Sequence, residues 1–347
     1  MATRGFYSID QCALFKLGSK TRLAELLHVP KSHLTKLAAG SDNYRLFELP
    51  REVCEFTGKV TKARWVQEPK NDLRQVHERL QKLLARIRPP EYGHAAVKGR
   101  SYRTNAAAHV HAAVAATFDI RRFYPSTPRL AVRDFFLHTL RCASDVAELL
   151  TTLCCYQDRT EEGAQCGLPT GSPLSPILSL YANRAMFDRL HRFALQHELT
   201  FTCYVDDLTF SGPLLPRSLG RFVRKTVDAY GHSLAVEKTK VFRRGQAKHV
   251  TGVVIVNNKI KVPNARFKKA RAIAAVIQRT ASDDYMRLLA LQRKLSGLLG
   301  EAAFLDPAFS DWARRSYRDL KKINEEAATS TSGVGAAKEG TGAVAFL

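Results

Sequence analysis

Residues 200–212 read TFTCYVDDLTFSG, in which two adjacent acids, Asp206 and Asp207, interrupt a run of β-branched and aromatic residues. Small polar residues alternate with these, a pattern typical of a strand, a tight turn and a second strand. Adjacent carboxylates repel each other, and each is costly to desolvate unless a cation compensates. A hard divalent cation such as Mg²⁺ takes oxygen ligands, so the turn predicts a metal site. The alternative interpretation is a solvated Asp-Asp turn.

A third acid follows another predicted strand. Residues 115–120, AATFDI, read as a buried strand that carries Asp119 near its end. If this strand and the hairpin are neighbours in one sheet, the three carboxylates converge, and such a cluster can hold two Mg²⁺ ions about 4 Å apart. The predicted reaction class is phosphoryl or nucleotidyl transfer. By itself, Asp119 would be a strand-end acid that caps a turn.

The composition favours a polyanionic partner. The chain of 347 residues has 54 Lys and Arg against 32 Asp and Glu, a formal charge of +22, which points to nucleic acid. Seven Cys without a C-x-x-C spacing fit neither a disulfide framework nor a zinc site, so we expect reduced thiols and a cytoplasmic protein. Neither a secretion signal nor an apolar stretch of about 18 residues is evident, so no membrane partner is expected.

The periodicity of apolar residues predicts an α+β architecture with helical, basic ends. Residues 20–27 and 32–39 form two short helical segments that also describe a helix-turn-helix, which leaves open a DNA-binding regulator without catalysis. The predicted helical stretches are 1–60, 64–88, a helix from Asn105, 129–156, 177–196, 216–230 and 264–325. Residues 163–176 are predicted as a loop, 233–236 and 250–256 as short strands, and the chain after about residue 326 as disordered.

Four segments together resemble the motifs of reverse transcriptases, in matching order and spacing. They are FDIRRFYPS (118–126) for motif A, GLPTGSPLSP (167–176) for motif B, YVDD (204–207) for motif C and GHSLAVEKTK (231–240) for motif D. Further elements are similar to those of bacterial retron reverse transcriptases: NAAAH (105–109), VTG (250–252), AAVKGRS (95–101) and FYSI (6–9). The resemblance covers residues 6 to about 320. Retron enzymes more often have Ala where this chain has Val205.

The resemblance implies a right-hand polymerase fold with fingers, a palm with an antiparallel sheet and a helical thumb. The implied boundaries are an N-terminal helical region 1–63, fingers 64–118, palm 119–262 with the motif B segment, thumb 263–325 and a disordered tail 326–347. It also implies two Mg²⁺ ions, with Mn²⁺ as the alternative. Their ligands would be Asp119, Asp206, Asp207 and the carbonyl oxygen of Ile120.

Further roles follow from the same resemblance. Tyr124 would lie under the incoming sugar and exclude a 2′-hydroxyl, and Lys238 would act on the leaving pyrophosphate. The other implied nucleotide-binding residues are Lys98, Arg100, Pro169, Thr170 and Gly171. The RNA-binding residues predicted are Asn105, His109, Arg266, Lys268, Lys269, Arg271, Arg293, Lys294, Arg314 and Arg315. For Asn105 and His109 the resemblance implies either a structural role or an RNA contact, and a helix N-cap with a side chain one turn later is the alternative.

A retron-type enzyme would copy part of a cognate structured non-coding RNA into DNA from deoxynucleoside triphosphates, giving a branched RNA–DNA product. Such systems are associated with anti-phage defence and an effector protein. A group II intron-like reverse transcriptase is the nearest alternative. It usually has a maturase region after the thumb, whereas here a low-complexity segment follows the predicted thumb.

Overall fold

The computed structural model describes residues 5–157 and 166–335, and the side chains of residues 5–157 and 166–326. The chain divides into two compact units. The first, here called the sheet unit, comprises Met1–Arg51 and Lys62–Lys259. The second, the helical unit, comprises Glu52–Thr61 and Ile260–Leu347. The helical unit is therefore assembled from two separate stretches of chain.

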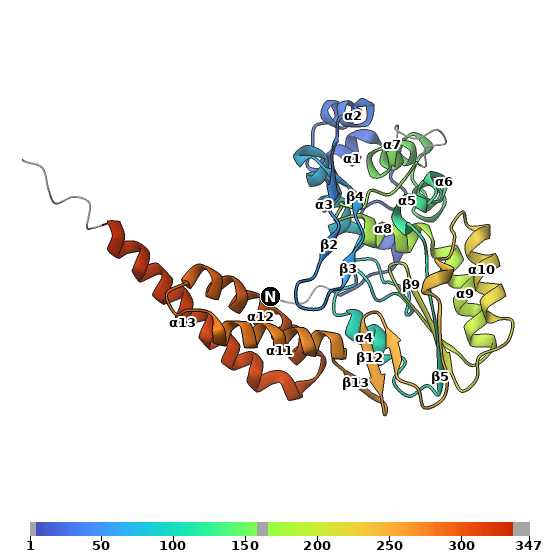
Figure 1. Cartoon of the computed structure of the whole chain (residues 1–347). Coiled ribbons are helices and arrows are strands. Elements are labelled where there is room, and N and C mark those ends of the chain that lie inside the picture. The colour runs from blue at the N-terminus through green and yellow to red at the C-terminus, as the bar shows by residue number, and fades with distance from the viewer. Residues whose placement is uncertain (1–4, 158–165, 336–347) are drawn as a thin grey trace, which may run out of the picture. The chain divides into compact units, whose positions relative to one another are not determined.

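A four-stranded antiparallel sheet lies at the centre of the sheet unit (Figure 1). The strands are ordered β10 (Lys240–Phe242), β5 (Val114–Asp119), β9 (Asp207–Gly212) and β8 (Thr200–Tyr204). The hairpin predicted around the two adjacent acids is β8–β9, and the strand predicted to carry Asp119 is β5. The predicted α+β polymerase fold is confirmed, and its two acid-bearing elements are neighbours in one sheet.

The sheet has one apolar and one polar face. Side chains alternate along each strand, and directly paired residues share a face. The apolar face carries Ala116, Phe118, Phe201, Cys203, Leu208 and Phe210, all buried. The polar face carries Thr117, Asp119, Thr202, Asp207, Thr209 and Ser211. The alternation that predicts the strands thus also separates the core side from the side that carries the acids.

Helices α9 (Arg184–Gln196) and α10 (Leu219–Ala229) pack together and contribute to the core cluster that includes the apolar face. Phe193 of α9 stacks on Phe222 of α10 with the ring centroids 4.0 Å apart. The helix predicted over 177–196 is broken at Asn183, between α8 (Ser175–Ala182) and α9. The buried Asn183 amide contacts Thr127 and His232, and these bonds stabilise the break.

The remaining helices of the sheet unit pack mainly through apolar stripes. They are α1 (Lys20–Leu27), α2 (Lys31–Ala39), α3 (Asn71–Leu84), α4 (Tyr102–Ala107), α5 (Phe123–Ser126), α6 (Arg129–Asp134) and α7 (Ser144–Cys154). Short turns of other helical types span Ile9–Gln11, Phe135–Thr139 and Val236–Lys238. Three small antiparallel pairs are β1 (Tyr44–Leu49) with β4 (Arg64–Pro69), β6 (Tyr156–Gln157) with β7 (Cys166–Gly167), and β11 (Lys248–Val250) with β12 (Val253–Val256). The predicted apolar stripe of α3 is buried as expected.

Several local predictions are wrong. Within residues 44–61 the regular structure is strand rather than helix, at residues 44–49, 52–53 and 60–61. The aromatic side chains of β1 suit its pairing with β4. The helix predicted over 64–88 begins only at Asn71, since Pro69 ends β4 just before it. The strand predicted at 233–236 is absent; Leu234 makes one bridge to Ile120, and regular pairing starts at Lys240.

Two predicted boundaries also change. The predicted division between residues 118 and 119 cuts β5, which is one strand of the central sheet. The predicted disordered tail begins too early, because α13 (Ser310–Gly335) extends well beyond residue 326. The rest of the predicted tail, and residues 163–165 of the predicted loop, lie outside the described residues.

The helical unit contains α11 (Asn264–Arg279), α12 (Tyr285–Leu305) and α13, together with the hairpin of β2 (Glu52–Val53) and β3 (Val60–Thr61). A short strand, β13 (Lys259–Lys261), precedes α11. The core of this unit is formed by Ala270, Ile273, Leu291, Leu295 and Leu299. Phe56, at the tip of the hairpin, packs against that core. None of the described helices is long and apolar enough to cross a membrane.

Buried histidines join separate parts of the sheet unit. His77 of α3 contacts the Leu153 carbonyl oxygen and the Ser172 hydroxyl, each at 2.7 Å. His232 contacts Ser126 and Asn183 at 2.7 and 2.8 Å. Burial lowers the pKa of both imidazoles from 6.5 to about 4, so each ring is neutral in the folded protein at pH 7.

These depressed pKa values predict a pH-dependent stability. Between pH 6.5 and 4 the unfolded chain binds protons at His77 and His232 that the folded chain does not bind. The stabilisation is therefore complete above pH 6.5 and is lost as the pH falls, by up to about 1.4 kcal/mol per pH unit for each histidine. We expect a lower midpoint of thermal unfolding at pH 5 than at pH 7. The variant His77→Gln should flatten this dependence, whereas His138→Gln, which changes an exposed histidine, should not.

Candidate functional site

The strand register brings the three predicted acids together. Asp119 and Asp207 are directly paired on β5 and β9, and both lie on the polar face. Asp206 lies in the adjoining turn, where its carbonyl oxygen accepts a hydrogen bond from the Ile120 amide at 3.0 Å. Val205, in the same turn, has φ of 60°, a conformation unfavourable for a β-branched residue. The turn thus stores backbone strain where the acids are held.

The acids repel one another. Burial, and next the negative charge of Asp206, raises the pKa of the Asp207 carboxyl to about 7. Burial and the charge of Asp119 also raise the pKa of Asp206. The ammonium of Lys238 lies 2.9 Å from both carboxylate oxygens of Asp119, and this hydrogen-bonded ion pair raises the pKa of Lys238. The Lys238 ammonium therefore neutralises part of the negative charge of the three acids.

The donor set suits a hard divalent cation, because three carboxylates share one turn and its paired strand. Among residues 5–157 and 166–326, however, no three His, Cys, Asp or Glu side chains form a ready metal-binding group. Lys238 occupies the oxygens of Asp119 instead. A cation held by all three acids would therefore have to compete with this ammonium.

Tyr124 lies close to the acids, as predicted. It belongs to α5, and burial followed by the charge of Asp206 raises its pKa. Its carbonyl oxygen accepts a hydrogen bond from the Leu168 amide at 2.9 Å, which joins the motif A segment to the motif B segment. The geometry therefore places the predicted sugar-contacting ring beside the carboxylates.

The motif B loop is held against β4 and α3. The Thr170 hydroxyl donates to the Gln67 side chain at 2.9 Å, and the Gly171 amide donates to the Gln67 carbonyl at 3.0 Å. A Cβ at Gly171 would lie 2.8 Å from that carbonyl oxygen, too close to be tolerated without movement. The backbone that Gly171 approaches here is that of β4. The Pro169 carbonyl accepts a hydrogen bond from Ser175, which closes the loop.

Lys98 and Arg100, the two predicted contacts to the triphosphate, differ in whether the charged group is free to reach a ligand. Lys98 is exposed. Arg100 donates to three backbone carbonyls, those of Pro90, Glu91 and Gly93, so its guanidinium holds a loop of its own chain. The geometry therefore favours Lys98 over Arg100 as a residue that reaches a nucleotide.

Asn105 and His109 are fully buried. The Asn105 amide donates to the Thr251 hydroxyl at 2.7 Å. His109 contacts Ser211 and Thr202 on the polar face at 2.6 and 2.7 Å. The predicted RNA contact of these two residues is therefore wrong for this structure, because neither side chain reaches the surface. The element is a structural connection between α4, the central sheet and the β11–β12 turn.

All the other predicted RNA-binding residues lie on the helices of the helical unit. Arg266, Lys268, Lys269 and Arg271 belong to α11, Arg293 and Lys294 to α12, and Arg314 and Arg315 to α13. Some already have partners: Arg266 pairs with Glu301 at 2.7 Å, and Lys294 with Glu55 at 3.6 Å. Because several basic side chains remain exposed on each helix, the unit presents a surface suited to phosphates.

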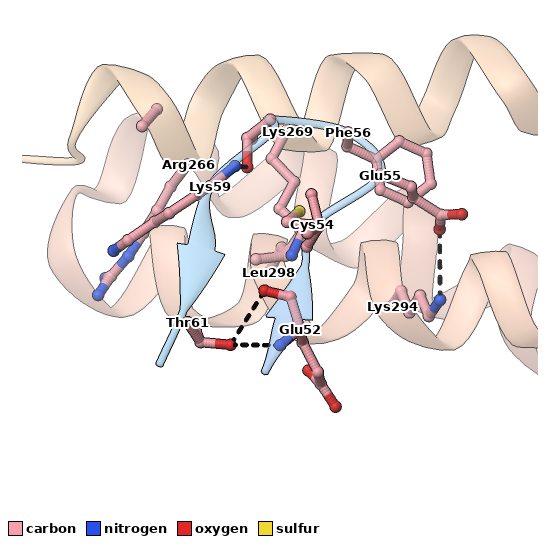
Figure 2. A pocket seen from close by; sticks show the side chains of 13 residues that line it. Glu52, Cys54, Glu55, Phe56, Lys59, Thr61, Arg266, Lys269, Lys294 and Leu298 are labelled. Atoms are coloured by element: carbon pink, nitrogen blue, oxygen red, sulfur yellow. Dashed lines mark hydrogen bonds and ion pairs between the residues drawn. The ribbon is translucent and has the colours of Figure 1, made fainter. Parts of the chain in front are cut away.

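A cavity of about 770 Å³ opens between the β2–β3 hairpin and helices α11 and α12 (Figure 2). Its lining includes three of these basic residues, Arg266, Lys269 and Lys294, together with the thiol of Cys54. Hydrogen bonds from Thr57 and from the Phe56 backbone lower the pKa of Cys54 to about 7. No sequence pattern predicts this site, because a hairpin remote in sequence supplies one wall.

Comparison with known proteins agrees with the sequence motifs. Residues 55–267 match the family described as "Reverse transcriptase (RNA-dependent DNA polymerase)". Among solved structures, a foamy viral protease-reverse transcriptase in complex with double-stranded DNA aligns with 94% of this chain and 49% of its own, at 16% identity and a TM-score of 0.45. Telomerase from Candida albicans aligns with 82% of this chain and 59% of its own, at 13% identity and a TM-score of 0.40.

The chain belongs to the reverse transcriptase family. Its relatives include the retron Mx65 reverse transcriptase of Myxococcus xanthus, 32% identical over 71% of this chain and 59% of the relative. The retron Se72 reverse transcriptase of Salmonella heidelberg is 27% identical over 56% of this chain and 48% of the relative. The chain thus spans about half to three fifths of these two relatives. The predicted resemblance to bacterial retron reverse transcriptases is confirmed.

The pKa of Cys54 predicts selective alkylation. At pH 7 about half of its thiol is ionised, and the thiolate is the reactive form. Burial raises the pKa of Cys12, Cys142, Cys154 and Cys203, so these should react much more slowly with iodoacetamide. Mass-spectrometric mapping at limited reagent would measure the order. The variant Thr57→Val should slow Cys54 and leave Cys166, whose pKa is also lowered to about 7, unchanged as an internal control.

Proposed function

We propose that this chain is an RNA-directed DNA polymerase of the retron type, which copies part of a cognate structured non-coding RNA into DNA. The observation that supports this most strongly is the direct pairing of Asp119 with Asp207, beside Asp206 in the turn. Carboxylates gathered in this way favour cationic partners, and nucleotidyl transfer depends on neutralising charge at the reacting phosphates.

Divalent-metal dependence is general in this family. The residues that would hold Mg²⁺, two ions with Mn²⁺ as the alternative, are Asp119, Asp206 and Asp207, with the Ile120 carbonyl as a further oxygen. When bound, such ions lower the pKa of an attacking hydroxyl and stabilise a leaving pyrophosphate. The protein would position the acids by strand pairing and through the hydrogen bond from the Ile120 amide to Asp206.

Other residues would orient the nucleotide. Tyr124, beside Asp206, would contact the sugar and exclude a 2′-hydroxyl. Lys238 would leave Asp119 and donate a proton from its Nζ to the leaving pyrophosphate. Lys98 would contact the triphosphate, and the loop of Pro169, Thr170 and Gly171 would shape the site. Since β4 holds that loop, the loop keeps its form before nucleotide binds.

The basic surface of the helical unit would hold the RNA and the RNA–DNA product through phosphate contacts, which give affinity rather than sequence recognition. As the retron resemblance implies, synthesis would start from a guanosine 2′-hydroxyl of the cognate RNA and leave a branched RNA–DNA molecule. A role in anti-phage defence with an effector protein belongs to the same proposal. Recovery of DNA joined to a short structured RNA from the purified protein would test it, by sequencing with and without debranching.

The variant Asp207→Asn tests the chemistry. We expect incorporation of deoxynucleotides opposite an RNA template to fall at least about a hundredfold, because one of the charge-binding carboxylates is lost. The thermal midpoint should hold or rise, since the amide removes repulsion with Asp206 and Asp119. Primer-extension rates and thermal unfolding would be measured on the same protein.

Asp228→Asn is the matched control, because it removes an exposed acid of α10. It should leave both extension and the thermal midpoint unchanged. If Asp207→Asn polymerises at the wild-type rate, the catalytic proposal is wrong. The DNA-binding regulator, which depends on α1 and α2, would then be the better account.

The salt dependence of RNA binding tests the phosphate surface. If six or more phosphates are contacted, the dissociation constant should rise by about a thousandfold between 50 and 200 mM salt. Replacing one exposed cation, as in Lys268→Gln, should reduce the slope of log K against log salt by about one. Filter binding with a structured RNA would measure both. A constant that does not change over this range would exclude a phosphate-dominated interface.

A further inference from the structure

The buried pair Asn105 and His109 lies in an element to which the proposed chemistry assigns no role. The two side chains project from α4 and the turn after it towards different neighbours. Asn105 donates to Thr251, 146 residues later, and His109 contacts the β8–β9 hairpin through Thr202 and Ser211. One short segment is therefore bonded both to the hairpin that carries the acids and to the β11–β12 turn.

The β11–β12 turn is held in a strained conformation. Thr251 and Gly252 both have positive φ, 47° and 73°, and Thr251 is β-branched, so its conformation must be stabilised by neighbours. The Asn105 amide supplies one such bond at 2.7 Å. The Lys248 ammonium supplies a second attachment, because it donates to the Ala112 carbonyl at 2.8 Å. The turn is thus fixed to the segment that follows α4.

This turn forms one wall of a cavity of about 470 Å³ on the polar face of the sheet. Asp119 and Asp207 lie in the same lining, with Lys240, His249, Thr251 and Gly252. On β9, His109 is attached at Ser211, four residues and about 13 Å from Asp207. The cavity therefore lies between the acids and the β11–β12 turn that Asn105 holds.

The lining suits a sugar-phosphate end of a polynucleotide. Lys240 offers a cation for a phosphate, while His249 and the hydroxyl of Thr209 offer hydrogen bonds to a sugar. Tyr124, which is close to Asp206, is absent from the lining. The cavity is accordingly distinct from the place proposed for the nucleotide sugar. A strand end that lies in it would present its hydroxyl to Asp119 and Asp207.

We propose that Asn105 is a positioning residue, which acts through Thr251 to set the wall of the cavity that receives the strand end to be extended. This rests on the proposed polymerase function for the identity of the ligand. The ligand is the terminal sugar-phosphate of the priming strand. His109 bonds the segment after α4 to the β8–β9 hairpin, and Lys248 bonds β11 to the Ala112 carbonyl of that segment. Loss of the Asn105–Thr251 hydrogen bond should weaken binding of the strand end and leave nucleotide binding unchanged.

Steady-state extension of a DNA primer on an RNA template, with the whole chain, tests this. Thr251→Val keeps the shape of the side chain but removes the hydroxyl, and Asn105→Ala removes its partner. Each should raise KM for the primed duplex about fivefold, the effect of one hydrogen bond. KM for the deoxynucleotide should stay within about twofold of wild type. The double variant should be no worse than either single variant, because one bond is lost in each case.

Two variants separate positioning from general stability. Thr251→Ser retains the hydroxyl and should restore the wild-type KM for duplex. Thr151→Val removes a buried hydroxyl that bonds the Ala147 carbonyl on α7, and should lower the thermal midpoint without altering either KM. Three outcomes would overturn the proposal. One is a rise in KM for the nucleotide, and another is a KM for duplex in the double variant that rises by the product of the two single effects. The third is a change in the thermal midpoint without any change in KM for duplex.

Binding of the same duplex, measured by fluorescence anisotropy without nucleotide, makes the result independent of catalysis. We expect the dissociation constant to rise about fivefold in Thr251→Val and to recover in Thr251→Ser. If the wild-type protein binds duplex but extends nothing, the polymerase proposal fails, while this measurement still decides the role of Asn105. Equal affinity in the wild type, Thr251→Val and Thr251→Ser, or no binding by any of the three, would overturn it.

Discussion

Asp119 and Asp207 face the same side of one antiparallel sheet, and the free energy of their mutual repulsion has to be offset elsewhere. The apolar face of the sheet, packed in the main core, provides stability that the polar face does not. Lys238 neutralises part of this charge through its ion pair with Asp119. Sites that bind and transform substrates commonly cost stability in this way, because their charges are arranged for the ligand.

Neutral polar side chains hold the segments around this site. His77, His109 and His232 are each hydrogen-bonded at both ring nitrogens, and burial keeps them uncharged. Each ring is hydrogen-bonded to partners that lie at least 49 positions away from it in the chain. Because a ring with two fixed partners permits little movement, these contacts align the motif B loop, the acid-bearing hairpin and the segment before β10.

The central strands and the acid cluster could be predicted from the sequence, because alternation in β5, β8 and β9 is local and the motif order constrains which strands meet. The roles of Asn105 and Arg100 could not, because each depends on partners fixed only by the tertiary structure. The strands at residues 44–61 were missed for a related reason. Their pairing with residues further along the chain overrides a weak helical pattern.

The hairpin of β2 and β3 lies between β1 and β4 in the sequence, yet its Phe56 packs into the core of the helical unit. The polypeptide therefore passes from one unit to the other three times. Recombination that exchanged only the stretch after residue 259 would deliver three helices without the aromatic ring that packs against them. The helices and this distant hairpin are consequently expected to evolve as one heritable module, despite the 198 residues, 62–259, that separate them.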